Sequence, residues 1–231
     1  MSDPLVRPFT VAVMQPYFIP YAGYFRLFAA SDLFVVYDCV QFPRRGWVHR
    51  NRLSDATGVE RWLTLPVAKM PRATRICDLR FQPNAPAILA ARLRRFPLLA
   101  RAPKSAGAVL EALREVDDTP VGYLERLLQR VVTYLGLPWN TIRSSELHLP
   151  DPLRGQDRIV EICRLLQAQR YVNVPGGRSL YRRQAFADSG IQLSFLSDYP
   201  GPASSILTRI VLDDREDLAQ DIRVAARDDG P

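Results

Sequence analysis

The segment between residues 38 and 49 combines side chains that could carry out nucleophilic chemistry. Cys39 offers a thiol, His49 an imidazole, and Asp38 a carboxylate. A thiolate is the nucleophilic form of cysteine, a nearby histidine can activate it, and a carboxylate can orient the imidazole. We therefore predict that Asp38, Cys39 and His49 are catalytic. Two alternatives stay open: Cys39 is a buried, inert thiol, or the segment forms a polar site without a nucleophile.

Two stretches of polar and aromatic residues surround these candidates. In residues 15–24, two prolines and Gly23 interrupt regular structure, and several rings carry hydrogen-bonding tips. Residues 41–53 are rich in arginine, whose guanidinium group binds phosphates and carboxylates in bidentate geometry. The alternative for the first stretch is an aromatic corner that packs on the sheet. The predicted substrate-binding residues are Gln15, Tyr17, Tyr21, Tyr24, Gln41, Arg45, Trp47, Asn51 and Arg52.

Two apolar runs predict strands that would bring both stretches to one edge of a sheet. Residues 9–15 and 33–37 are rich in β-branched and aromatic residues, which is typical of buried strands. Residues 24–30 between them predict a helix, and this order predicts a βαβ unit with parallel strands. Ligands of open α/β sheets bind at the carboxyl ends of the strands. We therefore expect residues 15–24 and 38–53 to share one edge.

The rest of the sequence predicts further strands and helices. We expect strands at residues 61–67, 74–81, 140–144, 171–174 and 191–195. We expect helices at residues 85–99, 105–116, 120–135, 156–168 and at the end of 205–222. The pattern indicates an α/β fold with a mostly parallel, Rossmann-like sheet. It predicts one domain over residues 1–231 with a helical insertion at about 85–137, and residues 41–53 as a loop.

Composition narrows the class of protein. Of 231 residues, 47% are hydrophobic and 24% charged, as in globular proteins with a core. No apolar run reaches the roughly 18 residues of a membrane span, so we expect a cytoplasmic protein without membrane contact. Three widely spaced cysteines and two histidines predict neither a metal site nor a tightly bound cofactor. The net charge of +7 favours acidic partners, but no motif indicates a nucleic-acid partner.

Several sequence blocks resemble the WbqC-like protein family. They are MQPYFIPYAGYFRLF, SDLFVVYDCVQFPRRGWVHRNRL and RWLTLPV, followed by SSEL and YVNVPGGRSLY, and they cover most of the chain. Such proteins occur among genes for O-antigen and other surface polysaccharides and in natural-product clusters. The resemblance implies a modifying enzyme, such as an acyl or aminoacyl transferase. Many relatives carry Asp at the position of Cys39 and Asn at that of His49, which implies that a cysteine mechanism would serve a subgroup.

Our leading functional hypothesis is a transferase that forms an amide or ester on an amino sugar or small metabolite. The donor would be a thioester of coenzyme A or of an acidic carrier protein, which suits the basic charge. The first alternative is an ATP-dependent ligase or nucleotidyltransferase, because the opening βαβ unit also resembles HUP-type nucleotidyltransferase domains. Tyr21 and Tyr24 stand where those enzymes carry phosphate-binding histidines. The second alternative is a non-catalytic protein that binds a nucleotide sugar.

Overall fold

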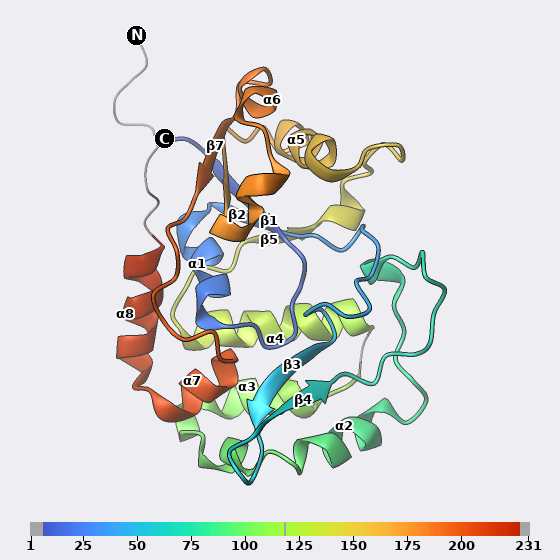
Figure 1. Ribbon diagram of the computed structural model, residues 1–231, viewed down its shortest axis with the longest axis vertical. Coiled ribbons are helices and arrows are strands. Elements are labelled where there is room, and N and C mark those ends of the chain that lie inside the picture. The colour runs from blue at the N-terminus through green and yellow to red at the C-terminus, as the bar shows by residue number, and fades with distance from the viewer. Residues whose placement is uncertain (1–6, 118, 227–231) are drawn as a thin grey trace.

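A five-stranded parallel sheet forms the centre of the computed structural model, which describes residues 7–117 and 119–226. Its strand order is β5-β2-β1-β6-β7 (Figure 1). The predicted βαβ unit is confirmed, since β1 and β2 pair in parallel with Val11 opposite Leu33. The strands are β1 (Thr10–Met14), β2 (Leu33–Val36), β5 (Thr141–Arg143), β6 (Arg170–Asn173) and β7 (Gln192–Phe195).

Helices cover both faces of this sheet (Figure 1). Strand residues alternate between the faces, as the pleat requires. Ala12 and Phe34 belong to a core shared with α1 and α4, and Val11 and Val13 belong to a second core shared with α5 and α6. The sequence prediction of an α/β fold is therefore confirmed. The α-helices are α1 (Ala22–Ala30), α2 (Ala85–Leu93), α3 (Gly107–Arg114), α4 (Pro120–Tyr134), α5 (Gly155–Leu165), α6 (Arg183–Ala187), α7 (Ile206–Leu212) and α8 (Arg215–Ala225).

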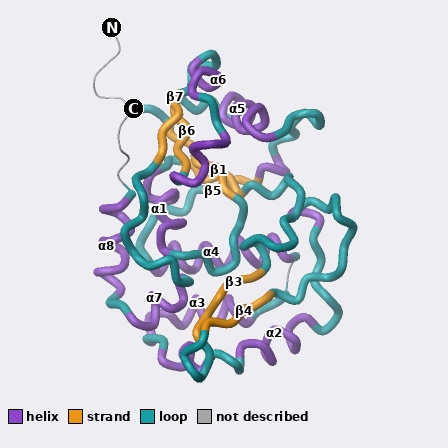
Figure 2. The backbone as a smooth tube through the Cα atoms, viewed as in Figure 1, coloured by secondary structure: helices purple, strands orange, loops and turns teal. Residues whose placement is uncertain are grey.

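An antiparallel hairpin of β3 (Arg50–Ser54) and β4 (Glu60–Thr64) lies apart from the sheet (Figure 2). The prediction of residues 41–53 as a loop is therefore wrong at its end. Only one face of the hairpin is apolar, where Leu53 and Leu63 enter the core. The strand predicted at residues 61–67 corresponds to β4, whereas β3 has one apolar residue, Leu53, and so shows no alternation that would indicate a strand.

The predicted strand at residues 74–81 is also wrong. This segment contains a 3-10 turn, η1 (Ile76–Asp78), and contacts its neighbours through isolated bridges. One bridge joins Gln41 to Arg75 and places the segment beside the chain that follows β2. The remaining 3-10 turns are η2 (Pro97–Arg101), η3 (Lys104–Ala106), η4 (Ser144–Glu146) and η5 (Pro175–Leu180).

The helical middle of the chain shares the larger core with the sheet. Thr119 caps α4, because its side chain accepts a hydrogen bond from the Gly122 amide at 3.2 Å. The predicted helix at 85–99 ends early, since α2 stops at Leu93 and Pro97 begins a 3-10 turn. Near the C-terminus, Asp214 caps α8 and separates it from α7.

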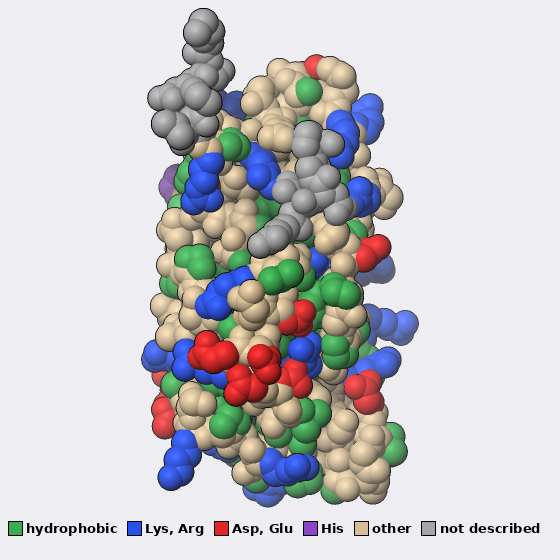
Figure 3. All heavy atoms as spheres, turned by 90° about the vertical axis from the view of Figure 1, so that its left-hand side faces the viewer, with side chains coloured by type: hydrophobic (Ala, Val, Ile, Leu, Met, Phe, Trp, Pro, Cys, Tyr) green, Lys and Arg blue, Asp and Glu red, His purple; other side chains and the backbone are tan. Residues whose placement is uncertain are grey.

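Arg26 of α1 ties the C-terminal segments to the sheet. Its side chain is fully buried, and Nη1 donates to the carbonyls of Ser197 (2.8 Å) and Ala225 (3.0 Å). Burial lowers the pKa of Arg26. The face that α8 forms carries a cluster of acidic side chains (Figure 3). Among the described residues, the model contains no helix with the length and apolarity that crossing a bilayer requires.

Candidate functional site

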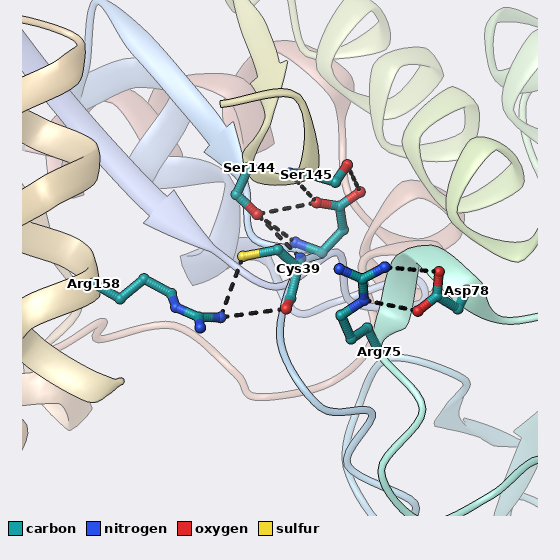
Figure 4. Close-up of polar contacts among 7 residues, drawn as sticks. Cys39, Arg75, Asp78, Ser144, Ser145 and Arg158 are labelled. Carbon is teal, nitrogen blue, oxygen red and sulfur yellow. Dashed lines mark hydrogen bonds and ion pairs between the residues drawn. The ribbon is translucent and has the colours of Figure 1, made fainter. Parts of the chain in front are cut away.

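Asp38 follows β2 and joins the carboxyl ends of two neighbouring strands. Its fully buried carboxylate accepts hydrogen bonds from Ser144 Oγ (3.0 Å), the Ser145 amide (2.9 Å) and Ser145 Oγ (2.8 Å), directly after β5. Ser144 Oγ in turn accepts from the amides of Asp38 and Cys39 at 3.0 and 3.1 Å. This network fixes the backbone that carries Cys39 (Figure 4).

The Cys39 sulfur points toward Arg158 of α5 (Figure 4). Arg158 Nη1 donates to Cys39 Sγ at 3.6 Å and to the Cys39 carbonyl at 3.3 Å, while Nε donates to the Leu153 carbonyl. Arg158 is only 9% exposed, and no carboxylate pairs with it within the described part of the chain. The partners of Arg158 are backbone carbonyls and the Cys39 sulfur, and an acidic group bound beside it would complement its nearly buried charge.

A cavity of about 620 Å³ opens beside Cys39. Its volume suits a small-molecule ligand. The cavity lies at the carboxyl ends of β2 and β5, where an open α/β sheet is expected to bind ligands. Its lining is strongly polar and basic, and it includes the second histidine of the chain. The lining residues are Cys39, Val40, Gln41, Ala73, Arg75, Ser144, Ser145, His148, Leu149, Asp151, Arg154 and Arg158.

The three arginines of the cavity are held in different ways. Arg75 forms a bidentate pair with Asp78, with distances of 2.8 and 3.2 Å, which raises the pKa of the guanidinium. Arg154 donates to the carbonyls of Asp151 and Leu153. Of these three, Arg158 is the one that donates a hydrogen bond to the Cys39 sulfur, while the charge of Arg75 also interacts with Cys39.

His49 lies in a different cavity from Cys39. It lines a cavity with Phe42, Arg44 and residues 67–70, and its ring contacts that of Phe42 at 5.0 Å. Its Nδ1 is buried, with no hydrogen-bond partner in the described part of the chain. Burial, followed by the charge of Arg50, lowers the pKa of His49 to about 4. Asp38 bonds to Ser144 and Ser145, so the structure does not bring the predicted catalytic set together around one imidazole.

The pKa of His49 predicts a stability change with pH. Above the usual histidine value of 6.5, His49 is neutral in the folded and the unfolded chain. As pH falls from 6.5 to 4, only the unfolded chain binds the proton, so stability is lost in this window. We expect His49→Gln to remove about 1–2 kcal/mol of this loss, after discount for partial exposure. Urea unfolding at pH 7 and pH 4.5 measures the free energy of unfolding of both proteins. If the variant loses as much stability between these pH values as the wild type, the assignment to His49 is wrong.

The stretch of residues 15–24 packs against the core. Tyr24 is 2% exposed, and its hydroxyl donates to the Gln15 carbonyl at 2.9 Å. Tyr17 and Tyr21 are half-buried, and they contact the rings of Tyr24 and Tyr199. Burial raises the pKa of Tyr17 and of Tyr24. The placement follows the aromatic-corner alternative more closely than an open binding loop.

Asn51 positions this first stretch instead of facing an open cavity. It is buried, and its amide donates to the carbonyls of Phe18 (3.1 Å) and Ile19 (2.7 Å). Ile19 has a φ of 42°, a left-handed conformation that costs a non-glycine residue free energy. Ser205 Oγ donates to the same Ile19 carbonyl at 2.9 Å. These bonds hold a backbone turn that the sequence alone does not specify.

The other predicted binding residues lie on the surface between the cavity and the hairpin. Gln41 lines the Cys39 cavity, and Arg45 lines a neighbouring one. Trp47 and Trp62 are partly exposed, with ring centroids 5.6 Å apart, and the Arg52 guanidinium lies 4.8 Å from the Trp62 ring. These residues form a basic and aromatic surface.

The two remaining cysteines have environments that keep them protonated. Burial, with the charges of Asp38 and Asp78, raises the pKa of Cys77 to about 11. Burial raises the pKa of Cys163 to about 12. Within residues 7–117 and 119–226, no group of three or more metal-ligating side chains is present.

The sequence reasoning missed most of the partners of Cys39. Ser144 and Ser145 belong to the SSEL block, which the sequence distinguishes only by its resemblance to the family. Arg154 precedes α5 and Arg158 lies in its first turns, and no sequence signal indicates that either residue faces Cys39. His148 has a φ of 51°, and such strain often occurs at functional sites, but no sequence signal distinguishes it from a loop residue.

Proteins of one family are similar to this chain along most of its length. The profile of the WbqC-like protein family matches residues 15–202, a range that contains Asp38, Cys39, Ser144 and Arg158. A Mycobacterium tuberculosis (strain ATCC 25618 / H37Rv) protein, "Uncharacterized protein Rv1507c", is 29% identical over 195 residues, which cover 83% of each chain. No solved structure matches the chain significantly. The site residues therefore lie within the part of the chain that relatives share.

Proposed function

The chain belongs to the WbqC-like protein family, and we propose that it is an acyltransferase that uses Cys39 as its nucleophile. It would move an acyl group from a thioester to the amine of an amino sugar or small metabolite. The observation that carries this proposal is the contact of Arg158 with the Cys39 sulfur at the wall of a polar cavity. A guanidinium beside sulfur attracts the thiolate, which is the reactive form.

The proposed reaction has two steps, acylation of Cys39 and transfer of the acyl group to the amine. The Cys39 thiolate attacks the carbonyl carbon of the donor, the new carbon–sulfur bond forms, and the donor thiolate leaves and takes up a proton. The acceptor amine then attacks the acyl group on Cys39. A carbon–nitrogen bond forms, the bond to Cys39 breaks, and a base accepts the proton that the amine loses.

His148 is better placed than His49 to accept that proton. His148 lines the same cavity as Cys39, whereas His49 lines another. A histidine with a pKa of about 4, such as His49, is a weak base at neutral pH. Asp38 acts in this scheme as a positioning residue, because its carboxylate holds the chain at Cys39 and not an imidazole.

Mass spectrometry of the intact protein and of its proteolytic peptides tests the proposal. Incubation with acyl-coenzyme A thioesters should add one acyl group to the protein, and this group should lie on the peptide that contains Cys39. Cys39→Ala should abolish the adduct, and the matched variant Cys77→Ala should keep it. His148→Gln should form the adduct but transfer it to amines about 100-fold more slowly, while His49→Gln should transfer it normally. Turnover by Cys39→Ala at the full rate would exclude the covalent route.

A further inference from the structure

A second cavity, of about 490 Å³, has arginines as half of its lining residues. Its walls are residues 41–45 and Arg72 from the facing loop. The Phe42 amide donates to the Thr74 carbonyl at 2.8 Å, and the Gln41 side chain donates to the Arg72 carbonyl at 2.7 Å. These bonds join the two loops, so the walls of the cavity keep a defined spacing.

The arginines of this cavity are free of carboxylate partners. None of Arg44, Arg45 and Arg72 forms an ion pair with any residue that the structure describes. Arg44 Nη2 donates to the Met70 carbonyl at 2.6 Å, which leaves its other donors available. Acidic side chains gather instead on the face of α8 (Figure 3). Three guanidinium groups around one concavity favour a multiply charged anion, and phosphate matches their geometry.

Gln41 lines both cavities, so the arginine-lined cavity is the neighbour of the one that contains Cys39. We propose that the second cavity binds the phosphate end of the thioester donor, while its acyl end passes Gln41 and reaches Cys39. This inference rests on the proposed acyl transfer and assigns the donor to the phosphopantetheine thioesters.

Phosphopantetheine occurs on coenzyme A and on carrier proteins. The surface near the arginines has aromatic side chains that could contact a nucleobase, and this distinguishes the two donors. Trp47 and Trp62 are 44% and 37% exposed, and the Arg50 guanidinium lies 4.2 Å from the Trp62 ring. The Arg50 and Arg52 guanidinium groups already lie over the Trp62 ring, so Trp47 offers the more open ring for a nucleobase, and these arginines lie close enough to hold its phosphates. Coenzyme A has such a base, and a carrier protein does not.

Isothermal titration calorimetry tests the site on the full chain. Coenzyme A and 4′-phosphopantetheine should bind, and pantetheine, which lacks the phosphate, should bind far more weakly. Arg45→Ala and Arg72→Ala should each raise the Kd for coenzyme A by about tenfold. The matched control is Arg164→Ala, which removes the same charge from an exposed pair with Glu161 on α5 and should change nothing. If Trp47→Ala weakens coenzyme A but not phosphopantetheine, the base lies on the tryptophans.

The outcomes separate this inference from the proposed reaction. Equal Kd values for pantetheine and phosphopantetheine, or unchanged Kd values for both arginine variants, would overturn the phosphate site. Adduct formation on Cys39 from a phosphate-free thioester, without any phosphate binding, would overturn this inference and leave the acyl transfer intact. Phosphate binding that depends on Arg45 and Arg72, without any adduct, would support the anion site and count against the transfer. Circular dichroism of each variant establishes that it folds.

Discussion

Arg158→Met is expected to slow the acylation of Cys39 by about 100-fold, because a preorganised charge at the reacting centre is lost. Nη1 of Arg158 is the cationic donor at the sulfur, and the side chain is nearly buried, so solvent screens it weakly. Arg158→Lys should recover part of the rate, since lysine keeps the charge but lacks the planar fork. The rate of adduct formation, followed by intact mass, measures both variants.

The reactivity of Cys39 can also be measured without a donor. At pH 7, iodoacetamide should modify Cys39 in preference to Cys77 and Cys163, whose raised pKa values keep them as thiols. Arg158→Met should slow this alkylation. Arg154→Met is the matched control, because Arg154 lines the same cavity but donates to backbone carbonyls. Equal alkylation rates in wild type and Arg158→Met would show that the guanidinium does not activate the sulfur.

Asp38→Ala is expected to lower the free energy of unfolding by about 3 kcal/mol, because it removes a buried carboxylate that accepts three hydrogen bonds, one of them fully buried. The carboxylate is fully buried, and the donors from Ser144 and Ser145 would be left without it. Asp38→Asn keeps the shape and one acceptor oxygen, so it should cost less. Ser145→Ala removes one hydroxyl donor and should cost about 1 kcal/mol.

Urea unfolding of the three variants measures these costs. If Asp38→Ala lowered the free energy of unfolding by less than Ser145→Ala does, this would contradict the role of Asp38 as the link between the ends of β2 and β5. The same variants separate positioning from direct catalysis. If Asp38 only positions the chain, Asp38→Asn should slow the alkylation of Cys39 slightly. The slower rate would reflect weaker hydrogen bonds from the Asp38 and Cys39 amides to Ser144 Oγ. If Asp38 instead oriented His49, Asp38→Asn and His49→Gln would reduce acyl transfer to the same extent.

Local sequence patterns predicted the elements whose formation depends on nearby residues. The parallel pair β1–β2 followed from two apolar runs and the helix between them, and α4 matches the helix predicted at residues 120–135. The second strand of the hairpin, β4, overlaps the strand predicted at residues 61–67, but β3 was missed. Leu53 is the only apolar residue of β3, so the segment shows no alternation of apolar and polar residues.

A polar, arginine-rich segment that follows a buried strand and contains Asp38 and Cys39 can be recognised from the amino-acid sequence. The groups that face these two residues depend on the three-dimensional fold. Ser144 lies 106 residues from Asp38, and Arg158 lies 119 residues from Cys39. Their approach depends on β5 pairing beside β2 and on α5 covering that edge. Strand order and helix placement arise from packing across the whole core, which no local spacing encodes, and for this reason Arg158, and not His49, contacts the Cys39 sulfur.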